Sequence, residues 1–335
     1  MVSLPLELVR HIAEFCPTSE LCSLVLLNRY CYDSMISSLY SNIKLNSWEN
    51  LVNFCRTVIL GRHPFHLYPQ SLHISIKGAR SEWCFNGDIE QDIRETLLLL
   101  QNVLVLILDF PTGDFPAVFS DARNRRIPPR QTTLEKFPLL DRLQNDHLTE
   151  TPVPTVPDIL PRLQSLTSTG FYLINLVPRR PVTDITLTDD TKPAHIPAMA
   201  STLACASKPL LSLDVFVHVR HARDCLIYLG RWLSKISCSY KSFEAITFRV
   251  SLVGGFFEYT PPTGIFYVEV APDDFCASLS RFEALRSFGI SLVADPRAFQ
   301  ALWFNVPELS DLASWQTFCP SLNHVSLFGK ILAAE

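Results

Sequence analysis

The sequence predicts an α+β or α/β chain in which a small N-terminal module of three helices precedes an irregular solenoid of alternating strands and helices. Two observations predict this arrangement. Three apolar stripes at helical spacing fall within the first 45 residues, and a short apolar motif of strand type recurs along the rest of the chain. We therefore divide the 335 residues into a helical domain over 1–45 and a repeat domain over 46–335.

The first helix is expected to begin at Pro5, because a missing N–H costs nothing at the first helical position. Leu8, Ile12 and Phe15 follow at spacings of four and three residues and form one apolar stripe, and Pro17 ends the helix. The other two stripes are Leu21, Leu24 and Leu27, and Tyr32, Met35, Ile36 and Leu39. A module this small buries little apolar surface, so we expect it to rest on a neighbour or a partner.

The segment LPLELVRHIAEFCPTSELCSLVLLNRYCYDS resembles an F-box over about 40 of the 335 residues. The family pattern places Leu-Pro-x-Glu-Leu at Leu4–Leu8, an isoleucine at Ile12, and a proline and an acidic-Leu helix start at Pro17 and Glu20. Arg29 fits the start of the third helix, whereas Cys31 stands where the family usually has Trp or Phe.

This resemblance implies a role as the substrate receptor of an SCF-type cullin–RING ubiquitin ligase. In that family the F-box packs on the S-phase-kinase-associated adaptor, which links it to the cullin. The resemblance implies, position by position, these apolar docking residues: Leu4, Pro5, Leu8, Ile12, Leu21, Leu24 and Leu27. The alternative is that these leucines form the inner core of a helical hairpin, and some of them must do so.

Beyond residue 69 an apolar motif recurs at positions i, i+3 and i+5, at intervals of 19 to 42 residues. Helical patterns separate several copies, over 89–100, 226–236, 299–303 and 312–318. A strand alternating with a helix at this period is typical of a solenoid with a parallel sheet. The copies begin near residues 69, 103, 163, 182, 210, 243, 285 and 322, with a weak one at Leu134, Phe137 and Leu139.

The phrases PRLQSLTS, KPLLSLDV and CPSLNHVSLFG resemble leucine-rich repeats of the divergent kind found behind fungal F-boxes. The asparagine usual after the strand is absent from nearly every copy, and an α/β domain of another topology would give the same alternation. In a repeat of this type the strands line the concave side, where alternate residues face outward. We expect the recruited protein substrate to meet His73, Asp109, Asp214, Phe216, Arg249 and His324, although an ordinary solvated sheet face is the alternative.

A proline-rich insertion over about 111–162 interrupts the repeats and carries Arg123, Arg125, Arg126 and Arg130. Bidentate hydrogen bonds from such arginines would suit an acidic or phosphorylated peptide. The alternative is a solvated insertion with no binding role.

Composition excludes several classes of function. A net charge of −4 offers no strong positive field for nucleic acid or an anionic membrane, and no apolar run is long enough to span a bilayer. The ten cysteines are scattered without a C-x-x-C pair, which favours reduced thiols in the cytoplasm or the nucleus.

Two pairs of histidines are spaced three residues apart, His63 with His66 and His218 with His221, but neither pair has further ligands at metal spacing. No catalytic or phosphate-binding motif is present in the sequence. We expect no enzyme activity, cofactor or metal. The alternative is a small-molecule enzyme in which a cysteine and a histidine that are distant in the sequence meet in the fold. The sequence thus favours a non-catalytic ligase receptor, and the alternative is a repeat scaffold or an F-box protein that acts outside a ligase.

Overall fold

The chain folds into strand–helix units that follow one another in space in the order of the sequence. The described part of the chain forms a ten-stranded sheet with the order β1-β2-β3-β4-β5-β6-β7-β8-β9-β10, in which every pair from β1 to β9 is parallel. The last strand, β10, pairs with β9 in the antiparallel sense. The strands are Asn42–Leu45 (β1), Ser71–Ser75 (β2), Val105–Asp109 (β3), Ser165–Ser168 (β4), Asp184–Leu187 (β5), Ser212–Val219 (β6), Ala245–Leu252 (β7), Ser287–Leu292 (β8), His324–Leu327 (β9) and Lys330–Ala333 (β10).

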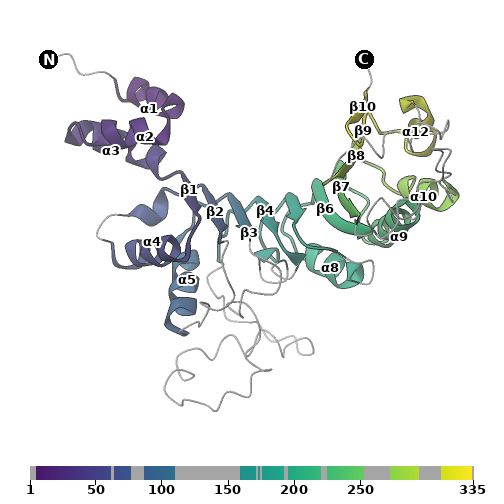
Figure 1. Cartoon of the computed structure of the whole chain (residues 1–335), viewed down its shortest axis with the longest axis horizontal. Helices are drawn as coiled ribbons and strands as arrows, with labels where there is room; N and C mark the ends of the chain where they lie inside the picture. The colour runs from purple at the N-terminus through teal and green to yellow at the C-terminus, as the bar shows by residue number, and fades with distance from the viewer. Residues whose placement is uncertain are drawn as a thin grey trace, which may run out of the picture.

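The structure is a computed structural model, and it describes residues 5–61, 64–76, 87–109, 159–170, 173, 176–191, 195–219, 225–252, 272–293 and 311–333. The sheet lines the concave side of an arc, the helices that follow the strands cover its convex side, and α1–α3 lie at one end beside β1 (Figure 1). The helices are Leu6–Phe15 (α1), Thr18–Val25 (α2), Arg29–Leu39 (α3), Trp48–Leu60 (α4), Phe65–Leu67 (η1), Gly87–Leu99 (α5), Ile196–Leu203 (α8), Cys225–Ser237 (α9), Pro272–Leu279 (α10) and Leu312–Phe318 (α12). The predicted fold class is confirmed: N-terminal helices precede a long parallel sheet of repeated strand–helix units.

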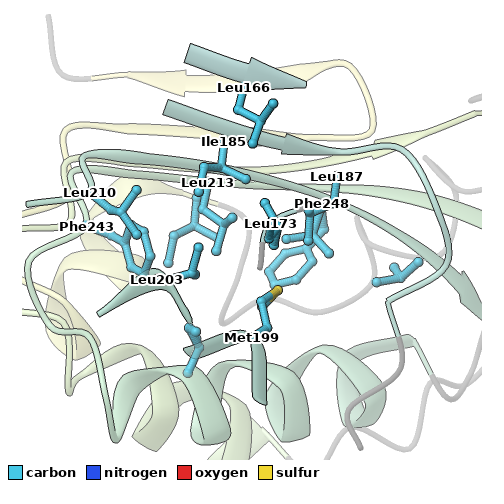
Figure 2. Packing of buried hydrophobic residues seen from close by; sticks show 14 of the residues in the cluster. Leu166, Leu173, Ile185, Leu187, Met199, Leu203, Leu210, Leu213, Phe243 and Phe248 are labelled. Atoms are coloured by element: carbon cyan, nitrogen blue, oxygen red, sulfur yellow. The ribbon is translucent and has the colours of Figure 1, made fainter. Parts of the chain in front are cut away.

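The recurring apolar motif builds the core one layer per strand. Its central residues are register partners across the sheet and are all buried: Leu72, Leu106, Leu166, Ile185, Leu213, Ile246, Phe288 and Val325. Figure 2 shows Leu166, Ile185 and Leu213 above Met199 and Leu203 of α8. Each unit buries its apolar face against its neighbours, which is why the array must be long to be stable.

A second backbone ladder runs through the turns before the strands. The N–H of Thr183 donates to the carbonyl oxygen of Gln164 at 2.8 Å, and Leu211 donates to Thr183 at the same distance. Glu244 and Arg286 continue this ladder, again with bonds of 2.8 Å. The turns before the strands are therefore stacked in register with one another, as the strands are.

Residues 42–45 differ from the prediction of three helices over 4–45, because α3 ends at Leu39 and these residues form β1. Ile43 and Leu45 alternate with exposed Asn42 and Lys44, which is the pattern of a strand with one buried face. Helices α4, α8 and α10 and strand β10 were also not predicted. The expected copy at 134–139, the helix at 299–303 and the insertion up to residue 158 lie outside the described residues.

Strand β10 is joined to β9 by a two-residue turn at Phe328 and Gly329. Both residues have positive φ, 48° and 91°, as a type I′ hairpin turn requires. The buried Phe328 ring and the bond from its N–H to the carbonyl oxygen of Ile290, at 2.7 Å, hold the turn in place. The hairpin adds a final antiparallel strand to the parallel array.

Candidate functional site

The concave face of the sheet presents alternate residues of each strand in rows that cross the sheet. One row includes His73, Ile107 and Thr167, and it continues through Thr186, Asp214, Thr247, Gly289 and Ser326. Most of these side chains are small. A Cβ atom on Gly289 would lie 3.1 Å from the Thr247 hydroxyl oxygen, so glycine suits this close approach. This row therefore gives the concave face a mostly polar floor.

Arg249 of β7 lies across β6 on this floor and joins three strands. Its Nε donates to Asp214 Oδ1 of β6 at 2.8 Å, and its Nη2 donates to the carbonyl oxygen of Leu187 at the end of β5, at 2.7 Å. The guanidinium carbon lies 5.9 Å from the centre of the Phe216 ring, within the range of a cation–π contact. The Phe216 ring also meets the His218 ring edge-to-face, with centroids 4.8 Å apart.

Three of the residues predicted to face the substrate, Asp214, Phe216 and Arg249, therefore form one cluster. Both charged side chains are about 30% exposed, at 31% for Arg249 and 29% for Asp214. This cluster is accessible but already internally paired, so its first effect is to fix the relative positions of β5, β6 and β7. Its capacity to bind a substrate stays a prediction.

The other three predicted residues lie elsewhere on the same face. Asp109 accepts a hydrogen bond from the Ser75 hydroxyl at 3.0 Å, and His73 is on β2 beside Ser75. His324 lies toward the other end of the sheet on β9, where its Nδ1 is 3.2 Å from the Ser287 hydroxyl. The six residues are thus spread along the arc and do not form one site.

Strand β6 extends further than β5, and the loop after β5 lies beside the part of β6 that has no partner in β5. Asp189 accepts a hydrogen bond from the N–H of Gly170, and Asp190 accepts one from the N–H of His218, each at 2.8 Å. Thr191 donates its N–H to the carbonyl oxygen of Phe216 at 3.2 Å. No pattern in the sequence predicted these cross-strand bonds.

The N-terminal helices have a small core of their own and an open apolar face. The core consists of Val9, Ala13, Leu21, Val25 and Met35. The expected stripe of α1 instead points away from this core, since Leu8 is 50% exposed, Ile12 is 44% exposed and Phe15 is 76% exposed.

The predicted docking residues consequently divide into two groups. Leu8, Ile12 and Leu27 are exposed, as is Pro5, whereas Leu21 is buried in the module core and Leu24 packs partly against it. Leu4 lies outside the described residues. Some of the predicted docking residues are therefore free to contact a partner, whereas others belong to the core of the module. Adaptor binding stays a prediction.

Two buried thiols, those of Cys55 and Cys225, are protonated at neutral pH. Burial raises the pKa of Cys55 to about 11 and that of Cys225 to about 12. Because the thiolate is the nucleophilic form, neither side chain is suited to nucleophilic catalysis. Among the described residues, no three His, Cys, Asp or Glu side chains gather as a metal site, and no helix is long and apolar enough to cross a membrane.

Comparisons with known proteins give little support for placing the chain in a family. No protein-family model matches the chain, and no curated protein matches it. A leucine-rich repeat-containing protein from Legionella pneumophila, LegL7, is similar in structure over 95% of this chain and 82% of its own, with 12% sequence identity and a TM-score of 0.39.

A TM-score of this size does not assign the chain to a class of protein, so that assignment is based on the sheet itself. Nine successive parallel strands, each core layer in register with the next, define a strand–helix repeat scaffold. Extended faces of such scaffolds are the surfaces that repeat proteins use for binding.

Proposed function

We propose that this chain is the substrate-recognition subunit of an SCF-type cullin–RING E3 ubiquitin ligase. The three N-terminal helices dock on the S-phase-kinase-associated adaptor, and the repeat scaffold recruits a protein substrate. The chain itself does no chemistry. It raises the effective concentration of the substrate at the subunits that transfer ubiquitin.

The observation that carries this proposal is the open apolar face of α1. Leu8, Ile12 and Phe15 lie on one side of a helix whose other side already packs on α3 through Val9 and Ala13. A module with its own core has no internal need for these exposed side chains, and a contiguous exposed apolar face is typical of a protein-binding surface. Leu8 and Ile12 are also residues of the F-box pattern.

The test is co-purification of the full chain with the adaptor, comparing wild type with a Leu8→Ala/Ile12→Ala variant. We expect the variant to lose most of the bound adaptor and to keep its thermal unfolding, since both side chains are half-exposed. Leu60→Ala is the matched control, because Leu60 is an exposed leucine of α4 outside the helical module. Unchanged adaptor binding by the double variant would overturn the docking surface.

The same experiment addresses the alternative of an F-box protein or scaffold that acts outside a ligase. Recovery of adaptor together with cullin supports the ligase role. Recovery of adaptor without cullin contradicts it and supports the alternative.

A further inference from the structure

The edge of the sheet at which the strands begin carries a row of exposed cations between β4 and β8. Because these strands are parallel, the segments that precede them all meet at this one edge. Each of these segments contributes at least one Lys or Arg side chain. We call this row the basic edge, and it consists of Arg162, Arg179, Lys208, Lys241, Arg281 and Arg286, all of which are exposed.

Backbone hydrogen bonds hold the segments that carry these cations next to one another. The N–H of Arg179 donates to the carbonyl oxygen of Cys205, three residues before Lys208, at 2.7 Å. The N–H of Arg286 donates to Glu244, three residues after Lys241, at 2.8 Å. The row is therefore a fixed feature of the stacked turns.

The basic edge is positive although the whole chain is negative. Its six cations are accompanied by three carboxylates, those of Asp184, Glu244 and Glu283, and Glu283 lies 3.5 Å from Lys241. The chain as a whole has a net charge of −4. The opposite edge, where the strands end, carries Asp109, Asp189 and Asp190. Among the described residues, these three carboxylates and the cations of the basic edge therefore lie at opposite ends of the strands.

We propose that the basic edge binds an extended acidic segment of a protein partner. This inference rests on the proposed function, because it names the chemistry by which the scaffold would hold the recruited protein. Four strand spacings of about 4.8 Å separate β4 from β8, a span of about 19 Å, which an extended peptide covers with about six residues. A carboxylate at every second residue repeats about every 7 Å, so about three carboxylates of such a peptide fall along the row of cations.

The aromatic residues of this edge favour a peptide over a single-stranded nucleic acid. Phe243 and Phe282 are buried, and half-buried Tyr240 packs on Phe243 with ring centroids 5.5 Å apart. Binding of single strands normally adds open aromatic rings on which bases stack. The described residues of the basic edge offer cations but no such open ring.

The test uses purified full chain and fluorescence anisotropy of a labelled peptide of about eight alternating Glu and Ser residues. The comparison peptide has Gln in place of Glu. We expect the wild type to bind only the Glu peptide, and to lose this binding between about 0.05 M and about 0.5 M salt as the charges are screened. Absence of Glu-peptide binding at low salt would overturn the proposal.

A Lys208→Gln/Lys241→Gln/Arg286→Gln variant removes half of the basic edge. At about two- to threefold per exposed charge, we expect its binding to weaken about tenfold. The matched control is Arg10→Gln/Arg56→Gln/Arg231→Gln, which neutralises three exposed cations elsewhere and should leave binding unchanged. Equal weakening by both variants contradicts a specific edge, and tighter binding of oligo-dT than of the Glu peptide would assign the edge to nucleic acid.

This result is separable from that of the adaptor test. The triple variant of the basic edge should bind the adaptor as wild type does, and Leu8→Ala/Ile12→Ala should bind the Glu peptide as wild type does. Peptide binding without adaptor binding supports the basic edge and contradicts the ligase role. Adaptor binding without peptide binding supports the docking surface of the proposed function and contradicts the basic edge.

Discussion

Gly230 of α9 is the position at which two opposing effects make the sharpest test of the packing. A Cβ atom built on Gly230 would lie 3.3 Å from the Cα of Phe275 and 3.4 Å from its Cβ, both in α10. The Gly230 carbonyl oxygen also accepts a hydrogen bond from the buried Ser278 hydroxyl, at 3.3 Å. The two helices approach each other at the one residue of α9 that has no side chain.

The Gly230→Ala substitution is predicted to destabilise the protein, against the trend of helix propensity. Alanine in place of glycine inside a helix would by itself stabilise the chain by about 1 kcal/mol. The added methyl group instead meets backbone of α10, which cannot rotate away, and overpacking of this kind costs about 1–3 kcal/mol. The expected net loss is about 1 kcal/mol, and Gly230→Val should lose more.

Thermal unfolding followed by circular dichroism measures this difference, and Arg231→Ala and Arg231→Gly calibrate it. Arg231 is exposed on the same helix, so the difference between these two variants gives the local propensity effect free of packing. We expect Gly230→Ala to lower the Tm by about 1–3 °C. A Tm that rises by the amount found between Arg231→Gly and Arg231→Ala would show that α9 and α10 do not pack this closely.

Three further measurements test the sheet, the thiols and a helix cap. Arg249→Met leaves Asp214 unpaired and should lower the free energy of unfolding by about 1 kcal/mol, and a double-mutant cycle with Asp214→Asn should show coupling between the two partly exposed charges. In native protein at neutral pH a thiol reagent should modify the exposed Cys22, Cys205 and Cys238, whereas Cys225, whose pKa burial raises to about 12, should react only after unfolding. Hydrogen bonds from the N–H and hydroxyl of Ser314 hold the pKa of Asp311 below its ordinary value of 3.8, so the stability difference between wild type and Asp311→Asn should persist at neutral pH. It should shrink as the pH falls through that lowered value, and a difference that grew with acid would contradict the cap.

The strands of the array were predictable because burial and period coincide in them. Leu213 and Phe248 lie at alternate positions that face the helices, and any sequence that buries one face of a strand shows this alternation. The helices were harder to predict where they are short. Helix α8, with Pro197 in its first turn, and the incompletely described α10 span eight residues each, too few for a clear helical period.

The stripe of α1 shows where periodicity stops being informative. Leu8, Ile12 and Phe15 gave the stronger apolar pattern, yet the small residue Ala13 and Val9 are the ones buried. In α1 the smaller side chains of Val9 and Ala13 face the module core, and the larger apolar side chains lie on the open side, where they suit an external partner. A hydrophobic stripe predicts that a face is covered, but not by which molecule.

The contacts among Asp214, Phe216 and Arg249, and the basic edge, could not be predicted from the sequence for a different reason. Arg249 contacts Leu187, which is 62 residues away in the chain, only because β6 brings β5 and β7 to a fixed separation. The cations of the basic edge precede their strands by unequal numbers of residues, in a chain whose net charge is negative. No periodic pattern marks them until the turns are aligned by their backbone ladder. Charge on an edge of a solenoid is a property of the stacking, so its function must be sought across repeats.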